Sequence, residues 1–394
     1  GETMEELKGK RRNNPFISNL NKKDVNHFTS DIGLFLRRKC DVPYKLVAHE
    51  LCGIHVIKPT TPSVLSDEEY FANLSEDKIP LSYYPLEEKK HNVIVERYPK
   101  LNKDEPYIFV CNHTCPEDIE TILNVLDRNA YLVLGSVKTL REEADGYLVW
   151  LNGTIPFDIS KEEERASVIP KADRVLKTNS ILIFPEASHN LDPNKLVNHL
   201  FDGPVNMALN TNRKIVLVSL VRDINQNVSF VDVSNPIDIN ALNEELDKKY
   251  QALKENLSVQ EYTKKKIKTI TAQLRDGMAS GVMNILLRHD QPLERKKYKD
   301  IEAYLRTLKV RDSFEKLHWN ENDDFAGEFQ TKKNPQEEEY KRVVEDIAAL
   351  ALSGKEVGFD QSGWVELAKD LENKNIPHVM EEHAKQLKKL KVNK

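Results

Sequence analysis

The stretch Tyr107-Ile-Phe-Val-Cys-Asn-His-Thr-Cys-Pro-Glu-Asp118 decides the fold class that we predict for this chain of 394 residues. Its first five residues form an apolar run without polar alternation, which is typical of a strand covered on both faces. We expect this strand to end at Cys111 and a helix to follow it. Thr114 and Glu117 have the spacing of a capping box, with Thr114 as the N-cap, and Pro116 falls in the first helical turn.

The same pattern continues on both sides of that stretch. Further apolar runs predict strands at 93–95, 130–134, 181–184, 215–221 and 228–233. Helix-length segments lie between the strands, at about 115–128, 162–178 and 195–212. Because buried strands alternate with helices, the sequence predicts an α/β fold with a mixed, mostly parallel sheet and flanking helices.

Charge and composition divide the chain into three predicted parts. Residues 1–90 are an N-terminal arm with a helical region, and 91–240 are the α/β domain, with 15 Lys and Arg against 21 Asp and Glu. Residues 241–394 are a helical C-terminal extension without a convincing strand. Within it, 248–299 holds 13 basic and 5 acidic side chains, and apolar residues at spacings of three and four predict an amphipathic helix over 261–288.

Overall composition excludes several classes of protein. A net charge of −5 does not fit a strongly basic nucleic-acid binder. No apolar run approaches the 18 to 20 residues that a spanning helix needs, so we expect at most peripheral membrane contact. The cysteines show neither zinc-ribbon nor disulfide-scaffold spacing, which favours a reducing, cytoplasmic location. They are Cys40, Cys52, Cys111 and Cys115.

The loop after the 107–111 strand carries the residues best suited to chemistry. Asp118, just inside the next helix, leans back toward His113. A carboxylate that holds an imidazole in one tautomer suits a general base acting on a hydroxyl. Three alternatives remain. The two residues can be an ordinary polar loop and a helix-dipole partner, Cys111, His113 and Cys115 can hold a metal, or Cys115 can be a nucleophile.

Two more segments are expected at the same edge of the sheet. The run 180–190 is a strand that leads into the polar turn Pro185-Glu186-Ala187-Ser188-His189. The run 150–158 contains Gly153 and Phe157 and precedes a helix that begins near Lys161. Open α/β sheets bind ligands at the carboxyl ends of their strands, so these segments are expected to share one site with His113.

Taken in order, three motifs resemble the glycerolipid acyltransferases, which include the lysophosphatidate and glycerol-3-phosphate acyltransferases. They are Asn112-His113-x4-Asp118, Gly153-x3-Phe157 and Phe184-Pro185-Glu186. The resemblance covers roughly residues 90–240 and matches the first three sequence blocks of that family.

The resemblance implies an O-acyltransferase. His113 would be the general base on the acceptor hydroxyl, Asp118 its orienting partner, and the donor an acyl-CoA or acyl-carrier protein. The acceptor would be lysophosphatidate or a related glycerolipid, and no metal or organic cofactor would be needed. The residues expected to bind substrate by the same resemblance are Asn112, Lys138, Gly153, Phe157, Lys161, Arg165, Pro185, Glu186 and Ser188.

Several positions depart from the family pattern. Ser160 stands where the second block usually has an Arg, so Lys161 or Arg165 would have to replace it. Ala187 stands where the third block has a Gly, and Ser219 where the fourth has a Pro. Three rival functions therefore stay open: acylation of a different alcohol or a lipid-linked amine, an inactive relative that binds lipid or protein, and a hydrolase.

A lipid acceptor would require a membrane-docking surface, which makes the protein peripheral on the inner face of the membrane. One candidate is the basic block 248–299, and its alternative role is to pack its apolar stripe on the sheet. The other is the N-terminal arm, where Phe16-Ile17 and Leu34-Phe35-Leu36 lie beside basic residues.

Overall fold

The computed structural model describes residues 29–289, except 75–76, 115–116, 136–145, 158–160, 187–196, 198–199, 224–225, 250 and 255. The helices are α4 (Asp31–Lys39), α5 (Asp41–Leu51), α6 (Asp67–Ala72), α7 (Asp118–Val125), α9 (Gly146–Asn152), α10 (Glu162–Val175), α11 (Gly203–Thr211), α12 (Ile239–Lys249), α13 (Gln251–Lys254) and α14 (Val259–Arg288), with a 3-10 turn η1 (Leu81–Tyr83). The strands are β1 (Ile54–Ile57), β2 (His91–Arg97), β3 (Ile108–Cys111), β4 (Ala130–Leu134), β5 (Thr154–Pro156), β6 (Ser180–Ile183), β7 (Ile215–Asp223) and β8 (Val228–Val233).

The eight strands form one sheet in the order β1-β2-β8-β7-β3-β6-β4-β5. All neighbouring pairs are parallel except β7 and β8, which are antiparallel. The strands β1, β2 and β8 therefore run opposite to the other five. The predicted α/β class with a mixed, mostly parallel sheet and flanking helices is confirmed.

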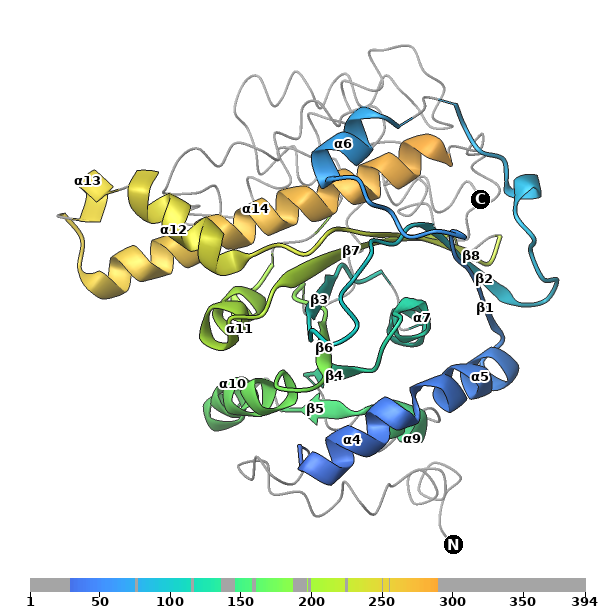
Figure 1. The fold of residues 1–394 in the computed structure, drawn as a ribbon, viewed down its shortest axis with the longest axis horizontal. Helices are drawn as coiled ribbons and strands as arrows, with labels where there is room; N and C mark the ends of the chain where they lie inside the picture. Colours follow the sequence, from blue (N-terminus) through green and yellow to red (C-terminus); the bar gives the residue numbers. More distant parts are fainter. Residues whose placement is uncertain are drawn as a thin grey trace, which may run out of the picture.

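Helices cover both faces of the sheet (Figure 1). Alternate residues of β3 face opposite sides: Ile108 and Val110 join the core under α10, α11, α12 and α14, whereas Phe109 and Cys111 join the core around α7. Both sets are fully buried. This burial explains why the strand has no polar alternation.

The helix α14 carries the apolar stripe that the sequence predicted over 261–288. Its capping box is complete, since Ser258 accepts from the Glu261 N–H and the Glu261 carboxylate accepts from the Ser258 N–H. The stripe packs on the sheet and joins the buried core, with Ile267 partly buried at one end. The buried stripe residues are Ile270, Leu274, Met278, Val282 and Ile285.

Segments on both sides of 91–240 pack on the same sheet. The strand β1 extends it beyond β2, and α14 lies across β7 and β8 (Figure 1). The three-part division of the chain stays a prediction, and residues 1–28 and 290–394 lie outside the described part.

Two local predictions need correction. The helix expected over 195–212 begins only at Gly203, because Val197 and residues 200–202 are not helical and Pro204 occupies the first turn. The strands β1 and β5 were not predicted, since they are only four and three residues long and β5 ends in Pro156. Among the described helices, none is long and apolar enough to cross a bilayer.

Candidate active site

The carboxyl ends of β3 and β6 bring the first and third motifs together. The two strands are parallel neighbours, with Val110 opposite Ile183. Three residues beyond each of these positions lie His113 and Glu186, so adjacent loops carry them at one edge of the sheet. For these two motifs, the expected shared site agrees with this register.

The predicted pair is formed in the structure. The His113 Nδ1 lies 2.9 Å from Asp118 Oδ2, and the Asp118 side chain is only 2% exposed. With Nδ1 donating to the carboxylate, the neutral ring keeps its lone pair on Nε2. The His113 side chain is 14% exposed, so the ring retains some access to solvent. This geometry suits a general base.

Asp118 is held by more than the histidine. The Thr114 hydroxyl donates to Asp118 Oδ1 at 2.8 Å, and the Thr114 N–H donates to Oδ2. Asp118 is also the first residue of α7, where the helix dipole favours a negative charge. These contacts fix the carboxylate that orients the imidazole.

The predicted capping box is wrong. The helix begins at Asp118, four residues after Thr114, and Glu117 is its N-cap without a side-chain cap bond. The Thr114 hydroxyl is used by Asp118 instead. The Glu117 carboxylate accepts from Arg222 on β7, at 3.0 and 3.2 Å. The Thr114 and Glu117 side chains therefore do not cap the helix: Thr114 bonds to Asp118, and Glu117 bonds to the neighbouring strand β7.

Glu186 contacts the backbone of the site histidine. Its Oε1 accepts from the His113 N–H at 2.6 Å, and the residue is 4% exposed. The ring of Phe184 lies 4.6 Å from the His113 ring, centroid to centroid. Pro185, which lies between Phe184 and Glu186 in the sequence, is buried, and its carbonyl accepts from the Phe201 N–H. The third motif thus holds the histidine loop from the side of β6.

Asn112 is a structural link between strands. Its Nδ2 donates to the Leu220 carbonyl at 2.9 Å, and its Oδ1 accepts from the Leu220 N–H at 2.7 Å. The side chain is fully buried and pairs with the backbone of β7. We therefore infer that Asn112 fixes the loop after β3 in place and does not contact the substrate.

The second motif has a strong packing reason for its glycine. Gly153 has φ +112°, and a Cβ there would lie 2.5 Å from a carbon of the Tyr131 ring. No side chain fits in that conformation and space. Phe157 follows β5, donates its N–H to the Leu134 carbonyl and is partly buried against the core.

The predicted cationic residues lie at the start of α10. Lys161 is the N-cap residue, its side chain is 64% exposed, and its Nζ lies 3.9 Å from a Glu164 carboxylate oxygen. Arg165 is exposed in the first turn. Lys138 and Ser188 lie outside the described residues, as do the departures at Ser160 and Ala187.

Thiol chemistry gains no support from Cys111. The side chain is fully buried, and burial, with smaller contributions from Asp118 and Glu186, raises the pKa of its thiol well above the usual value. The Sγ lies 3.1 Å from the Asn112 carbonyl. A protonated, enclosed thiol is a poor metal ligand and a poor nucleophile. Cys115 lies outside the described residues.

Two contributors to the site were missed. Thr114 and Phe184 contact Asp118 and His113, respectively. The aromatic residue was part of a recognised motif, but only the packing of β6 beside β3 reveals its contact with the ring. The sequence signal at Thr114 favoured a helix cap, which misdirected the interpretation.

Comparison with known proteins finds a family model that matches the segment containing this site. The family model described as Acyltransferase matches residues 92–221, which include His113, Asp118 and Glu186. No curated protein matches the chain. Among solved structures, the chain resembles the 1-acyl-sn-glycerophosphate (LPA) acyltransferase PlsC from Thermotoga maritima, at 18% identity over 42% of this chain and 69% of that one, with a TM-score of 0.32. The similarity to acyltransferases is thus carried by residues 92–221.

Proposed function

We propose that this protein transfers a fatty acyl group from an acyl thioester, acyl-CoA or acyl-carrier protein, to the hydroxyl of lysophosphatidate or a related glycerolipid. The observation that carries the proposal is the 2.9 Å contact between His113 Nδ1 and the buried Asp118 carboxylate, within a domain of the acyltransferase family. No metal or organic cofactor is part of the proposal.

In the proposed reaction, His113 Nε2 accepts the proton of the acceptor hydroxyl as its oxygen attacks the thioester carbonyl. The tetrahedral intermediate then collapses, the C–S bond breaks, and the thiolate takes the proton back from His113. Asp118 keeps Nδ1 protonated and stabilises the imidazolium formed in between. Asp118 is thus a positioning residue, and His113 is the catalytic residue.

The proposal gives the remaining motif residues different tasks. Glu186 is a buried carboxylate bonded to the His113 backbone, so we assign it to positioning the histidine loop, because a phosphate would be repelled by its charge. Lys161 and Arg165 lie at the N-terminal end of α10, where exposed cations and helix N–H groups suit an anionic headgroup.

The test follows release of free thiol from oleoyl-CoA in the presence of a panel of lysolipids. We expect release that requires one acceptor, with an acylated lipid as the product. His113→Ala should abolish it, and Glu117→Gln is the matched control because that neighbouring carboxylate is 62% exposed and pairs with Arg222.

The rival functions are separated by the same assay. Release that ignores the acceptor identifies a thioesterase, and release with an alcohol or amine outside the glycerolipids identifies a different acceptor. Failure to release thiol from both oleoyl-CoA and acyl-carrier protein would overturn the enzymatic proposal and favour a binding protein.

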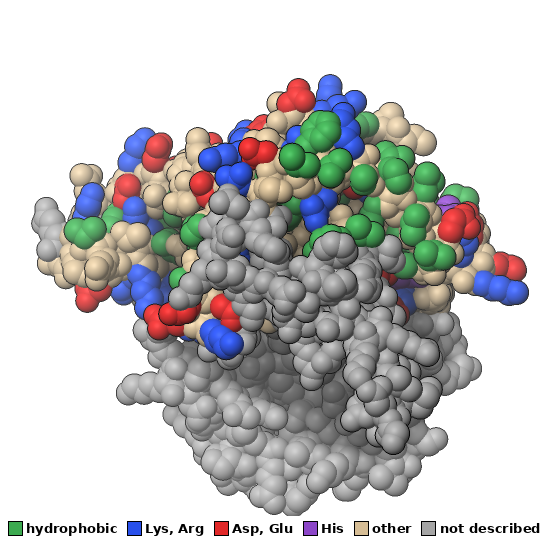
Figure 2. Space-filling model, turned by 90° about the horizontal axis from the view of Figure 1, so that it is seen from below, with side chains coloured by type: hydrophobic (Ala, Val, Ile, Leu, Met, Phe, Trp, Pro, Cys, Tyr) green, Lys and Arg blue, Asp and Glu red, His purple; other side chains and the backbone are tan. Residues whose placement is uncertain are grey.

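We further propose that the surface formed by α4 and α5 docks on an anionic membrane. Figure 2 views the molecule from below, the side on which these helices lie in Figure 1, and shows hydrophobic side chains beside Lys and Arg. The exposed basic residues Arg38 and Lys39 end α4, whereas Arg37 is half-buried and donates to the Trp150 carbonyl. The exposed apolar residues of these helices are Ile32, Phe35, Leu36, Val42, Leu46, Val47 and Leu51. Apolar side chains next to cations suit an anionic bilayer surface.

The alternative docking helix α14 is less suitable. Its apolar stripe is buried on the sheet. Several of its cations are also occupied inside the protein: Lys266 donates to Asp247 at 2.8 Å, and Arg275, 3% exposed, donates to the Val197 carbonyl at 3.0 Å. The helix therefore offers few free groups to a membrane.

A further inference from the structure

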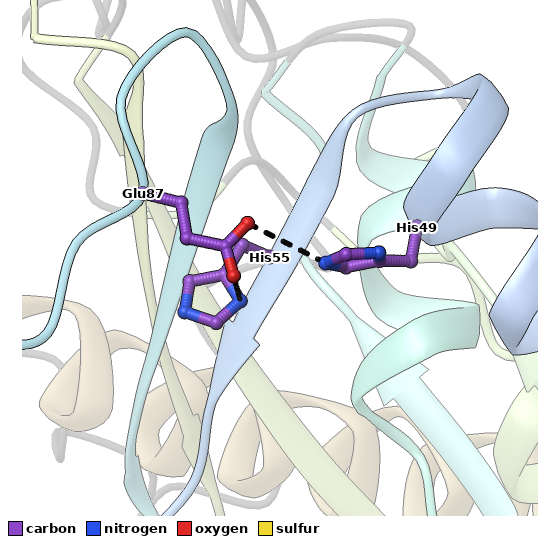
Figure 3. Close-up of side chains that lie close together, drawn as sticks. All are labelled: His49, His55 and Glu87. Atoms are coloured by element: carbon purple, nitrogen blue, oxygen red, sulfur yellow. Dashed lines mark ion pairs between the residues drawn. The ribbon is translucent and has the colours of Figure 1, made fainter.

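A second cluster of polar side chains lies at the outer end of the sheet, on strand β1. His49 comes from the last turn of α5, His55 from β1, and Glu87 from the loop before β2. The His49 Nε2 lies 3.5 Å from Glu87 Oε2, and the His55 Nδ1 lies 3.3 Å from Glu87 Oε1 (Figure 3). One atom of each residue lies within 4.8 Å of the other two.

The local backbone holds the three residues in place. Gly53, between α5 and β1, has φ +64°, a conformation that lets the chain reverse and brings His49 beside His55. The Asn92 side chain accepts from the Glu87 N–H at 2.9 Å and donates to the Glu87 carbonyl at 3.0 Å. The cluster is therefore built on ordered backbone from three separate segments.

Hydrogen bonds on the outer side fix the tautomer of each histidine. The His55 Nε2 lies 3.2 Å from the Pro85 carbonyl, which can only accept, so Nε2 carries the hydrogen. The His49 Nδ1 lies 3.0 Å from Glu50 Oε1, a carboxylate oxygen that also only accepts. In the neutral rings, the lone pairs of His49 Nε2 and His55 Nδ1 consequently face Glu87.

Two lone pairs that face a carboxylate favour a positive charge between them, which a metal ion can supply. The His–Glu distances are close to the separation of about 3.4 Å between two ligands that each lie about 2.1 Å from a tetrahedral ion. Outer carboxylate and carbonyl acceptors on metal-binding histidines are the usual second layer of such sites. We propose that His49, His55 and Glu87 bind a divalent transition-metal ion of the Zn²⁺ type.

The donor set defines the kind of ion. Two imidazole nitrogens and one carboxylate oxygen suit Zn²⁺ better than Ca²⁺ or Mg²⁺, which prefer oxygen ligands. Three protein ligands leave the fourth tetrahedral position to water, and the 34%, 22% and 42% exposure of the three side chains gives the ion an entry path.

Lys90 competes with the ion. Its Nζ lies 3.4 Å from His49 Nε2, 3.5 Å from His49 Nδ1 and 3.5 Å from Glu87 Oε2, so the ammonium lies beside the place where the ion would bind. Because this side chain is long and 25% exposed, it can turn into solvent when the ion binds. Metal affinity should therefore rise when its charge is removed.

The binding test uses the full chain, stripped with a chelator and titrated with Zn²⁺ against a chromophoric indicator. We expect one strong site whose affinity falls more than 100-fold in His55→Gln and in Glu87→Gln. Glu50→Gln should weaken it roughly 10- to 100-fold, as loss of an outer partner does. Lys90→Met should bind several-fold tighter, and Glu69→Gln, an exposed carboxylate on α6, is the matched control.

Two further measurements test metal binding by this cluster without an activity assay. Co²⁺ should give the visible absorption of a tetrahedral site in the wild type and not in His49→Gln. Zn²⁺ should raise the Tm of the wild type, but not of His55→Gln, whose Tm without metal reports on its folding. Equal affinity in the wild type and both histidine variants would overturn the proposal, as would the absence of binding.

Discussion

At the scale of single residues, Asp118 determines the geometry of the candidate active site. It accepts from the His113 ring, the Thr114 hydroxyl and the Thr114 N–H while it is buried at the start of α7. A carboxylate with three donors has little freedom to move. The direction of the His113 ring therefore depends on this carboxylate.

We expect Asp118→Asn to lower kcat by roughly 10²- to 10⁴-fold, because the amide no longer stabilises the imidazolium or selects the tautomer whose lone pair is on Nε2. The KM for both substrates should change much less. Steady-state kinetics measure this split, and thermal melts establish that the variant is folded. A loss confined to KM would show that Asp118 serves substrate binding instead.

His91 should make stability depend on pH. Burial lowers its pKa from 6.5 to about 4, with a smaller contribution from Arg222, while Glu117 and Asp118 oppose the shift. The unfolded chain binds the proton first as the pH falls, so stability drops from pH 6.5 toward pH 4. The drop is at most about 3 kcal/mol. Urea unfolding at several pH values should show a flatter profile in His91→Gln, and an unchanged profile would contradict this.

At the scale of elements, the contact between α14 and β7 depends on a glycine. A Cβ on Gly281 would collide with the Cβ and Oγ of Ser219, whose hydroxyl donates to the Met278 carbonyl at 2.9 Å. One turn earlier, a Cβ on Gly277 meets only Leu217 Cδ1, at 2.9 Å, the end of a flexible side chain.

Gly281→Ala should therefore destabilise the protein by about 1–3 kcal/mol, as overpacking does. Gly277→Ala is the matched control and should cost less, because Leu217 can move and Ala favours the helix by about 1 kcal/mol. Chemical denaturation measures both changes. Ser219→Gly in the Gly281→Ala background should recover part of the loss, and purely additive effects would show that the two residues do not collide.

An ion pair fastens α6 to the sheet. Arg97 on β2 donates to both Asp232 oxygens on β8, at 2.8 and 2.9 Å, and to Asp67 in α6 at 2.6 Å. The Arg97 side chain is 1% exposed. Removing one partner leaves an unpaired buried charge, so Arg97→Ala should cost about 3–5 kcal/mol in urea unfolding. Arg97→Met with Asp232→Leu should cost less, and equal losses would contradict a charge effect.

The sequence predicted the elements whose signals are local. The strands β3 and β6 are continuous apolar runs, and the α14 stripe is regular, so each was found. The strand β1, Ile-His-Val-Ile, was missed because it is a short edge strand with a polar residue inside it. The order of strands depends on pairings between distant segments, which local periodicity does not contain.

In the candidate site too, residues in local motifs were predicted, whereas contacts between distant segments were not. His113, Asp118 and Glu186 were identified because their motifs are compact, and the structure brings them together. The task of Asn112 was not identified, because its partner, Leu220, lies 108 residues away. The use of Thr114 by Asp118 depends on where α7 begins, and helix boundaries are poorly defined by sequence.

At the scale of the whole molecule, the α4–α5 surface should control membrane binding. In sedimentation with vesicles containing anionic lipid, we expect Phe35→Ser with Leu46→Ser to lower the bound fraction several-fold, since both side chains are exposed and apolar. Lys264→Ser with Lys265→Ser on α14 is the comparison and should have little effect. The reverse ranking would assign docking to α14, and unchanged binding in both would contradict both surfaces.

The change of strand direction in the sheet also constrains how the chain is made. The strands β1 and β2 emerge first from the ribosome, yet β2 finds its inner neighbour only in β8, more than 130 residues later. The two halves of the sheet meet solely at β7 and β8, a hairpin near the end of the described sheet. During synthesis, the backbone N–H and C=O groups on the inner edge of β2 therefore stay unpaired until that hairpin appears, which exposes the nascent chain to aggregation.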